Sequence, residues 1–176
     1  EEMLQGDSAY LNVLKKVGVQ ITKTKCGIES SMTSMANGGT FDFNDISDTF
    51  LSLAAVSPLL SSPLTISGIA HTRKQETDRV SAMATELRKL GQSVEESDDQ
   101  LRIIPNLNIL RELAVNGLEI DTYKDHRFAM SFGILGCHDL LGNGDPWLKV
   151  KDPNCCAKTF PDFFRELENM RKMSHS

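Results

Sequence analysis

Two stretches of the chain place apolar and polar residues with the period of an α-helix. They are "DSAYLNVLKKVG" (residues 7–18) and "DRVSAMATELRKLG" (residues 78–91). In each, apolar residues recur three or four positions apart, cations occupy the last turn and a glycine marks the end. Each stretch leads into a strand-like segment, 19–25 and 93–105 respectively, and "SDDQ" divides the second into a predicted hairpin.

The pattern also repeats along the chain. Residues 41–60 align with residues 121–140 at an offset of 80. This alignment superposes Asp45 on Asp125, and each aspartate precedes an apolar helical stretch. We therefore expect both aspartates to be helix N-caps.

The repeat continues with a strand and a second helix. The segment "LTISGI" (64–69) recurs as "LKVKDP" (148–153) at an offset of 84. The charged segment 71–79 corresponds to residues 154–170 in the repeat. A unit of about 80 residues thus reads strand, helix, two strands, helix, strand. Such units bury their helices beneath sheets, which predicts an α+β fold (α/β by some schemes).

Composition narrows the class of protein. The chain of 176 residues is 40% hydrophobic and 24% charged, as in ordinary globular proteins, and its net charge of −5 argues against a nucleic-acid partner. The longest nearly apolar stretch, 50–64, contains two prolines and is too short to span a membrane. We therefore expect a small-molecule partner and no membrane anchor.

The four cysteines add little chemistry. No CxxC spacing occurs among them, so we expect neither a zinc site nor a disulfide framework, and a reducing cytoplasm fits. The chain begins with glutamate rather than methionine, and we expect it to be cut from a longer protein. The cysteines are Cys26, Cys137, Cys155 and Cys156.

Four charged loops lead into helix starts: 44–48, 71–79, 123–127 and 155–161. Helix N-termini attract anions, and arginine offers a planar fork that matches phosphate or carboxylate. Three cations in these loops could therefore converge on one multiply charged anion: Arg79, Arg127 and Lys158.

Each of these side chains also has an ordinary interpretation. Loop arginines are most often solvated or paired with nearby carboxylates such as Glu76 and Asp78. Lone histidines, here His71 and His126, are usually surface groups. The shared position of the loops in the repeat favours the anion site.

At these loops the sequence resembles the 5-enolpyruvylshikimate-3-phosphate (EPSP) synthase family. "NDISD" resembles the family's NDIPD-like segment, and "RKQETDR" its R-x-K-E-[ST]-D-R helix start. "YKDHRFAMSF" resembles its DHRMAM motif, and "DPNCCAKTFPDFF" its D-P-x-C-x-x-K-T-[FY]-P-x-[FY]-F ending. The similarity runs in order from about residue 3 to the C-terminus.

The resemblance implies a fold of two globular domains, each an inverse barrel of three βαβαββ units around buried helices, with the active site between the domains. The chain would be the C-terminal two-fifths of such an enzyme. Residues 1–40 would end one unit, 41–120 form a complete unit and 121–176 form the final unit, all within one domain. The N-terminal domain would be its partner, and we expect the enzyme to be monomeric.

The resemblance also implies the reaction. The family transfers the enolpyruvyl group of phosphoenolpyruvate to the 5-hydroxyl of shikimate 3-phosphate and releases phosphate, without a metal ion or organic cofactor. Asp45 would bind the shikimate hydroxyls and accept the proton of the attacking oxygen. Glu76 would deliver a proton to the enol carbon, with His126 as its neighbour.

The binding residues follow from the same motifs. By resemblance, Arg79, Arg127 and Lys158 would bind phosphoenolpyruvate, and His71 and Gln75 join Asp45 at shikimate 3-phosphate. The family more often has asparagine and lysine at the positions of His71 and Gln75. Gln75 keeps hydrogen-bonding capacity without the charge, unless Lys74 replaces it from next door.

Two alternatives remain. The sister enzyme that transfers enolpyruvate to UDP-N-acetylglucosamine shares the repeat but normally lacks the D-H-R and A-M-S pattern of 125–131. A non-catalytic binding or assembly module could keep the repeat and lose the chemistry. The resemblance further implies a cytoplasmic enzyme, or a plastid one in a plant, and we expect the chain alone to be inactive.

Overall fold

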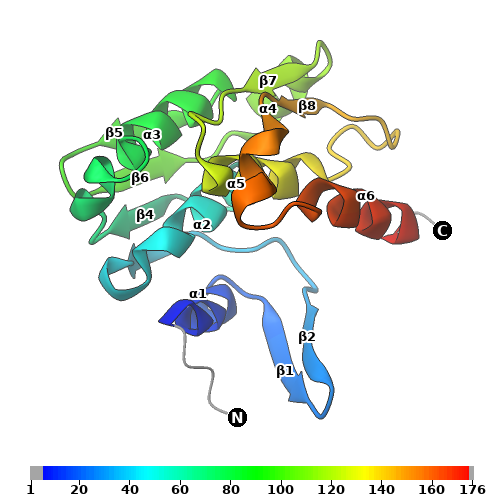
Figure 1. Ribbon diagram of the computed structural model, residues 1–176, viewed down its shortest axis with the longest axis horizontal. Coiled ribbons are helices and arrows are strands. Elements are labelled where there is room, and N and C mark those ends of the chain that lie inside the picture. Colours follow the sequence, from blue (N-terminus) through cyan, green and yellow to red (C-terminus); the bar gives the residue numbers. More distant parts are fainter. Residues whose placement is uncertain (1–5, 175–176) are drawn as a thin grey trace.

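The computed structural model describes residues 6–174. Its N-terminal segment contains a short helix and an antiparallel hairpin that lie to one side of the remaining elements (Figure 1). Val13 and Val17 anchor the helix in the core, whereas every residue of the second strand is exposed. The elements of this segment are η1 (Gly6–Ala9), α1 (Tyr10–Lys16), β1 (Gln20–Thr24) and β2 (Gly27–Ser31).

A four-stranded mixed sheet forms one flank of the molecule. Its strands, in spatial order, are β3 (Gly39–Asp42), β4 (Leu64–Ser67), β6 (Leu101–Ile104) and β5 (Ser93–Glu96). Strands β3 and β4 are parallel, and the other pairs are antiparallel. Alternate residues of β4 and β6 are buried, so one face of the sheet covers the core. The hairpin predicted at "SDDQ" is confirmed between β5 and β6.

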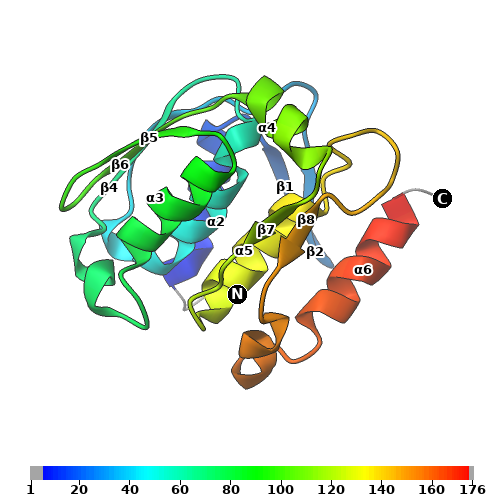
Figure 2. The same ribbon diagram turned by 90° about the horizontal axis from the view of Figure 1, so that it is seen from above.

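Helices lie beneath this sheet. Figure 2 shows α3 (Arg79–Lys89), α2 (Phe50–Val56), α5 (His126–Gly136) and α6 (Phe163–Ser174) side by side. Helices α2 and α5 are the most apolar, and their buried residues belong to one continuous hydrophobic core. The predicted α+β class with helices beneath sheets is confirmed.

The C-terminal part repeats the parallel pairing on a smaller scale. Strand β7 (Leu118–Ile120) pairs with β8 (Leu148–Val150), and α5 connects them. Helix α4 (Leu107–Ala114) precedes β7 and is capped by the side chain of Asn106. Four short 3₁₀ helices complete the connections: η2 (Asn44–Thr49), η3 (Ser57–Leu59), η4 (Ala70–Lys74) and η5 (Pro153–Lys158).

The two expected N-caps differ. Asp125 caps α5, because its Oδ1 accepts the backbone N–H of Arg127 at 2.9 Å. The expectation for Asp45 is wrong: α2 begins at Phe50, and Asp45 lies inside η2. The backbone at Ile46, whose side chain is buried, is non-helical, so the segment that contains Asp45 is not continuous with α2.

Among residues 6–174, no helix is long and apolar enough to cross a membrane.

Candidate active site

The four charged loops meet where helices begin or end. Arg79 is the first residue of α3, and Arg127 is the second residue of α5. Asp48 lies in η2, and Lys158 is the last residue of η5. These positions are far apart in sequence, and the packing of α2, α3 and α5 brings them together.

Arg79 is surrounded by acceptors from three loops. Only 2% of its side chain is exposed. Its Nε donates to Asp125 Oδ2 at 2.7 Å, its Nη2 to Glu76 Oε2 at 2.6 Å and its Nη1 to Asp48 Oδ1 at 2.8 Å. Nη1 also donates to the side-chain oxygen of Gln75. The positive charge is therefore matched by carboxylates rather than by solvent.

Asp48 connects two of the predicted anion-binding cations. Its second carboxylate oxygen accepts Arg127 Nη2 at 2.7 Å, while the first accepts Arg79. Sequence reasoning selected Asp45 in the same loop and missed Asp48. The Asp45 side chain instead accepts a hydrogen bond from the Asn44 side-chain amide at 3.1 Å. The sequence does contain a signal for Asp48, because "NDISD" has a second aspartate three residues after Asp45.

Glu76 links the cluster to η5. Its Oε1 accepts Lys158 Nζ at 3.0 Å, and its Oε2 accepts Arg79. The hydrogen bond from Lys158 lowers the pKa of Glu76 below the usual value of 4.5, and the charges of Arg79 and Lys158 lower it further, against the opposing effect of burial. Glu76 is therefore ionised at neutral pH in this arrangement.

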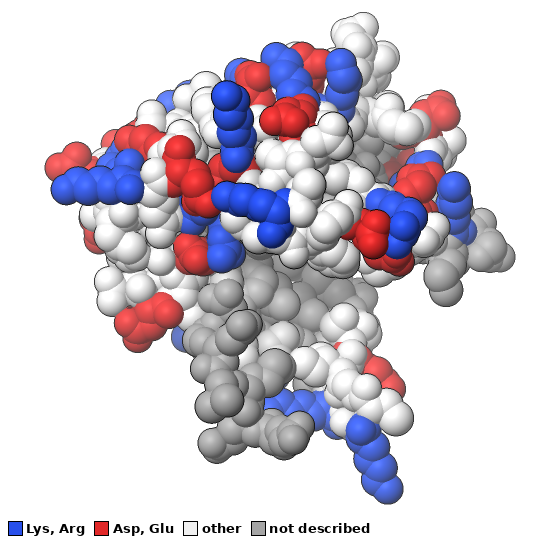
Figure 3. All heavy atoms as spheres, in the orientation of Figure 1, with Lys and Arg blue, Asp and Glu red and all other residues white. Residues whose placement is uncertain are grey.

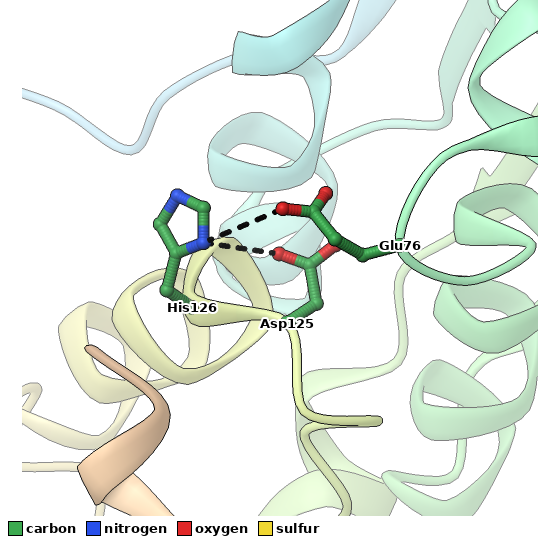
Figure 4. Close-up of side chains that lie close together, drawn as sticks. All are labelled: Glu76, Asp125 and His126. Carbon is green, nitrogen blue, oxygen red and sulfur yellow. Dashed lines mark ion pairs between the residues drawn. The ribbon is translucent and has the colours of Figure 1, made fainter. Parts of the chain in front are cut away.

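His126 faces the two carboxylates (Figure 4). Its Nδ1 is 3.8 Å from Asp125 Oδ1 and 3.9 Å from Glu76 Oε1, beyond hydrogen-bond distance, and this buried nitrogen has no hydrogen-bond partner. Burial lowers the pKa of His126 below 6.5. The imidazole is therefore neutral at pH 7 and able to exchange a proton beside Glu76.

Glu76, Asp125 and His126 could also be considered as a cation site. One ligand atom from each lies within 4.8 Å of the others. However, Asp125 already binds Arg79, and Glu76 binds both Arg79 and Lys158. A metal ion would have to enter beside these positive charges, so the donor set favours proton transfer over metal binding.

The other predicted residues lie at the edge of the cluster. His71 Nε2 is 2.7 Å from Ser47 Oγ in η2, and the Gln75 side chain turns toward Arg79. Asp45 and His71 contact Asn44 and Ser47 rather than this cluster. The structure thus brings six of the predicted residues into one network: Gln75, Glu76, Arg79, His126, Arg127 and Lys158. Figure 3 shows lysine and arginine side chains lying among aspartate and glutamate side chains on the face of Figure 1.

Neighbouring charges in the 71–79 segment are structural. The Asp78 side chain caps α3 by accepting the Ser81 N–H at 3.0 Å. Arg73 pairs with Asp78 at 2.9 Å and with Glu96 of β5 at 3.0 Å. These bonds fasten η4 to the β5–β6 hairpin and so fix the segment that carries Gln75 and Glu76.

Comparison with known proteins gives one consistent result. The family model for EPSP synthase (3-phosphoshikimate 1-carboxyvinyltransferase) matches residues 1–167. A 3-phosphoshikimate 1-carboxyvinyltransferase of Opitutus terrae is 50% identical over 173 residues, which cover 97% of this chain and 35% of that protein. One of Nostoc punctiforme is 42% identical over 170 residues, covering 97% of this chain and 37% of that protein.

Solved structures agree on the fold. EPSP synthase from Acinetobacter baumannii superposes with a TM-score of 0.73 at 21% identity, over 96% of this chain and 40% of that one. The enolpyruvyl transferase NikO from Streptomyces tendae gives a TM-score of 0.61 at 17% identity, over 92% of this chain and 34% of that one. The chain spans little more than a third of the length of these curated relatives. On the match to the family model and the identity to these relatives, the chain belongs to the EPSP synthase (3-phosphoshikimate 1-carboxyvinyltransferase) family.

Proposed function

We propose that the chain is part of an enzyme that transfers the enolpyruvyl group of phosphoenolpyruvate to the 5-hydroxyl of shikimate 3-phosphate. The observation that carries this proposal is the convergence of Arg79, Arg127 and Lys158 around two carboxylates. A phosphorylated enol carboxylate carries about three negative charges, which three such cations would match.

Phosphoenolpyruvate would replace protein carboxylates at these cations. Lys158 is 54% exposed and Arg127 31% exposed, so an incoming anion reaches them first. Arg79 is buried, so it would bind the ligand only as Asp48 and Glu76 give way. Because the ligand would compete with Asp48 and Glu76 for these cations, both carboxylates would change their hydrogen-bond partners when the ligand binds.

Glu76 is our candidate for proton delivery. The hydrogen bond from Lys158 keeps Glu76 ionised, and transfer of Lys158 to the ligand would raise the proton affinity of Glu76. The substrate oxygen adds to C2 of the enol while the C3 methylene takes the proton, which gives a tetrahedral intermediate. Loss of phosphate and of one C3 proton then gives the product, with Glu76 and neutral His126 able to exchange that proton.

Asp48 is our candidate for the carboxylate that accepts the proton of the attacking hydroxyl. It takes the role expected of Asp45, because its oxygens bind Arg79 and Arg127 whereas Asp45 contacts Asn44. For shikimate 3-phosphate we keep His71 and Gln75 as proposed contacts, acting as neutral hydrogen-bonding groups.

The rest of the enzyme is also part of the proposal. An N-terminal domain of the same protein would close the site, and the enzyme would be a monomer. Within this chain we propose the unit boundaries 1–40, 41–120 and 121–176. Four free cysteines fit a reducing compartment such as the cytoplasm.

Two neighbouring aspartates provide a matched test. In the complete protein that carries this chain, Asp48→Asn should lower kcat/KM by about 10²–10⁴, the usual contribution of a general base. Asp45→Asn should lower it less than tenfold. Product formation from phosphoenolpyruvate and shikimate 3-phosphate is the measurement.

Other outcomes identify the alternatives. Loss of activity in Asp45→Asn with Asp48→Asn unaffected would return the role to Asp45. Turnover of the unsubstituted protein only with UDP-N-acetylglucosamine would indicate the sister transferase. Absence of turnover with both acceptors would indicate a non-catalytic module.

A further inference from the structure

A buried carboxylate outside the site is bound to the segment that precedes α5. Glu86 of α3 has no exposed side-chain surface. Its Oε1 accepts the Tyr123 hydroxyl at 2.5 Å, and its Oε2 accepts the backbone N–H of Asp121 at 3.1 Å. Lys89 Nζ lies 2.8 Å from Glu86 Oε1. The reaction proposed above does not use the side chains of Glu86, Tyr123 and Lys89.

The segment that Glu86 holds has an unusual backbone. Tyr123 and Lys124 both have left-handed φ angles, 56° and 60°, although neither is glycine. Such conformations are uncommon for residues with a Cβ and persist only where surrounding contacts hold them. The next residue is Asp125, followed by His126 and Arg127.

Tyr123 is fixed at both ends of its side chain. Its ring packs edge-on against Phe128 of α5, with 5.5 Å between ring centroids, and its hydroxyl donates to Glu86. Partial burial raises the pKa of Tyr123 above 10, and the Glu86 carboxylate raises it further, so the hydroxyl stays protonated and remains a donor. The ring and the hydroxyl therefore connect α5 to α3.

Glu86 and Arg79 lie on the same face of α3. They are seven residues apart, which is two helical turns. Arg79 binds Asp125, and Glu86 binds Tyr123 and Asp121, so one helix face holds the 121–125 segment at two points. Lys89 adds an ion pair to the Asp121 side chain at 2.8 Å.

We propose that Glu86 is a positioning residue for the candidate site: by binding the Tyr123 hydroxyl and the Asp121 amide, it fixes the start of α5 against Arg79. The proposed effect on the position of α5 rests only on the contacts of Glu86 with Tyr123 and Asp121. The effect on catalysis rests on the proposed function.

The two tyrosines of the chain give a matched pair of variants. Tyr123→Phe removes the hydroxyl that binds Glu86 and keeps the ring on Phe128. Tyr10→Phe removes the corresponding hydroxyl in α1, on the N-terminal segment. We expect Tyr123→Phe to accelerate hydrogen exchange at Arg79 Nε–H and at the Arg127 amide at least tenfold, measured by NMR on this chain.

The control determines whether the effect is local. Both donors bind Asp125, so they report the contact between α5 and Arg79. Tyr10→Phe should leave them unchanged, and neither variant should alter exchange of the α2 amides. Glu86→Gln should reproduce the Tyr123→Phe pattern. Unchanged exchange at the two donors, or equal acceleration throughout α2, would overturn the positioning role.

A kinetic measurement separates this proposal from the proposed function. In the complete protein, Tyr123→Phe should lower kcat at least tenfold with a smaller change in KM for shikimate 3-phosphate. If the unsubstituted protein has no transferase activity, the proposed function fails while the exchange result still decides the role of Glu86. If the protein is active and Tyr123→Phe has unchanged kcat, the catalytic part of the proposal is wrong.

Discussion

Arg79 and Asp125 form the most buried ion pair of the candidate site. Asp125 has no exposed side-chain surface, and Arg79 has almost none. Burying these charges is costly unless they are hydrogen-bonded, and each side-chain nitrogen of Arg79 and each carboxylate oxygen of Asp125 has a partner. At the residue scale, the geometry of the site therefore depends on matched charges that come from different loops.

His126 should make stability depend on pH. Burial lowers its pKa, and so do the charges of Arg127 and Lys158, whereas Asp125 and Glu76 raise it. As pH falls below about 6.5, the unfolded chain binds a proton at this histidine before the folded chain does. Stability from this group is therefore complete above pH 6.5 and is lost as pH falls toward the lower folded pKa.

The measurement is the melting temperature at pH 7.5 and pH 5.5. The unsubstituted chain should lose more stability over this interval than His126→Asn, which cannot titrate. The interval stays above the range in which Glu76, with its lowered pKa, contributes. An equal loss in both proteins would contradict the effect of burial on His126.

The segments that lead into β3 and β4 approach each other closely, and glycine permits this approach. A Cβ at Gly38, the residue before β3, would overlap the backbone carbonyl oxygens of Ser62 and Pro63. The same backbone position pairs β3 with β4, because Gly39 N donates to Pro63 O at 2.9 Å. Neither backbone segment can move without disturbing the sheet.

Gly38→Ala should therefore lower the free energy of unfolding by about 1–3 kcal/mol, as overpacking of a core does. Gly136→Ala in α5 is the control, since its Cβ would meet Leu148 at 3.4 Å, an ordinary contact. We expect that variant to change stability by less than about 1 kcal/mol. Urea denaturation measures both, and equal effects would contradict the close approach at Gly38.

At the element scale, periodicity predicted the long elements better than the short ones. Helix α3 and the β5–β6 hairpin are confirmed because their apolar spacing, cap and turn residues agree. Strand β2, helix α4 and the 3₁₀ helices that the structure describes were not predicted. All of β2 is exposed, so its residues show no apolar alternation, and α4 has only eight residues.

The whole molecule contains only part of the structure expected for its family. The chain spans about a third of its curated relatives, and the exposed β1–β2 hairpin stands apart from the main sheet (Figure 1). The site of the family is expected between two domains, of which this chain supplies side chains from one. Its cations are already paired with its own carboxylates.

We therefore expect the 176-residue chain alone to convert no phosphoenolpyruvate and shikimate 3-phosphate, and the complete protein to convert both. An assay of phosphate release with the two proteins at equal concentration is the measurement. Turnover by the chain alone would refute the need for a second domain.

Local periodicity and contiguous motifs were enough to predict the fold class, the main helices, the charged loops at helix starts and the family. The tertiary structure decided which acid binds which cation. Asp48, and not Asp45, binds Arg79 and Arg127, and the two aspartates lie on opposite sides of the non-helical residue Ile46. Lys158 and Glu76 are 82 residues apart, so only the packing of the helices that carry their loops could bring them within 3.0 Å.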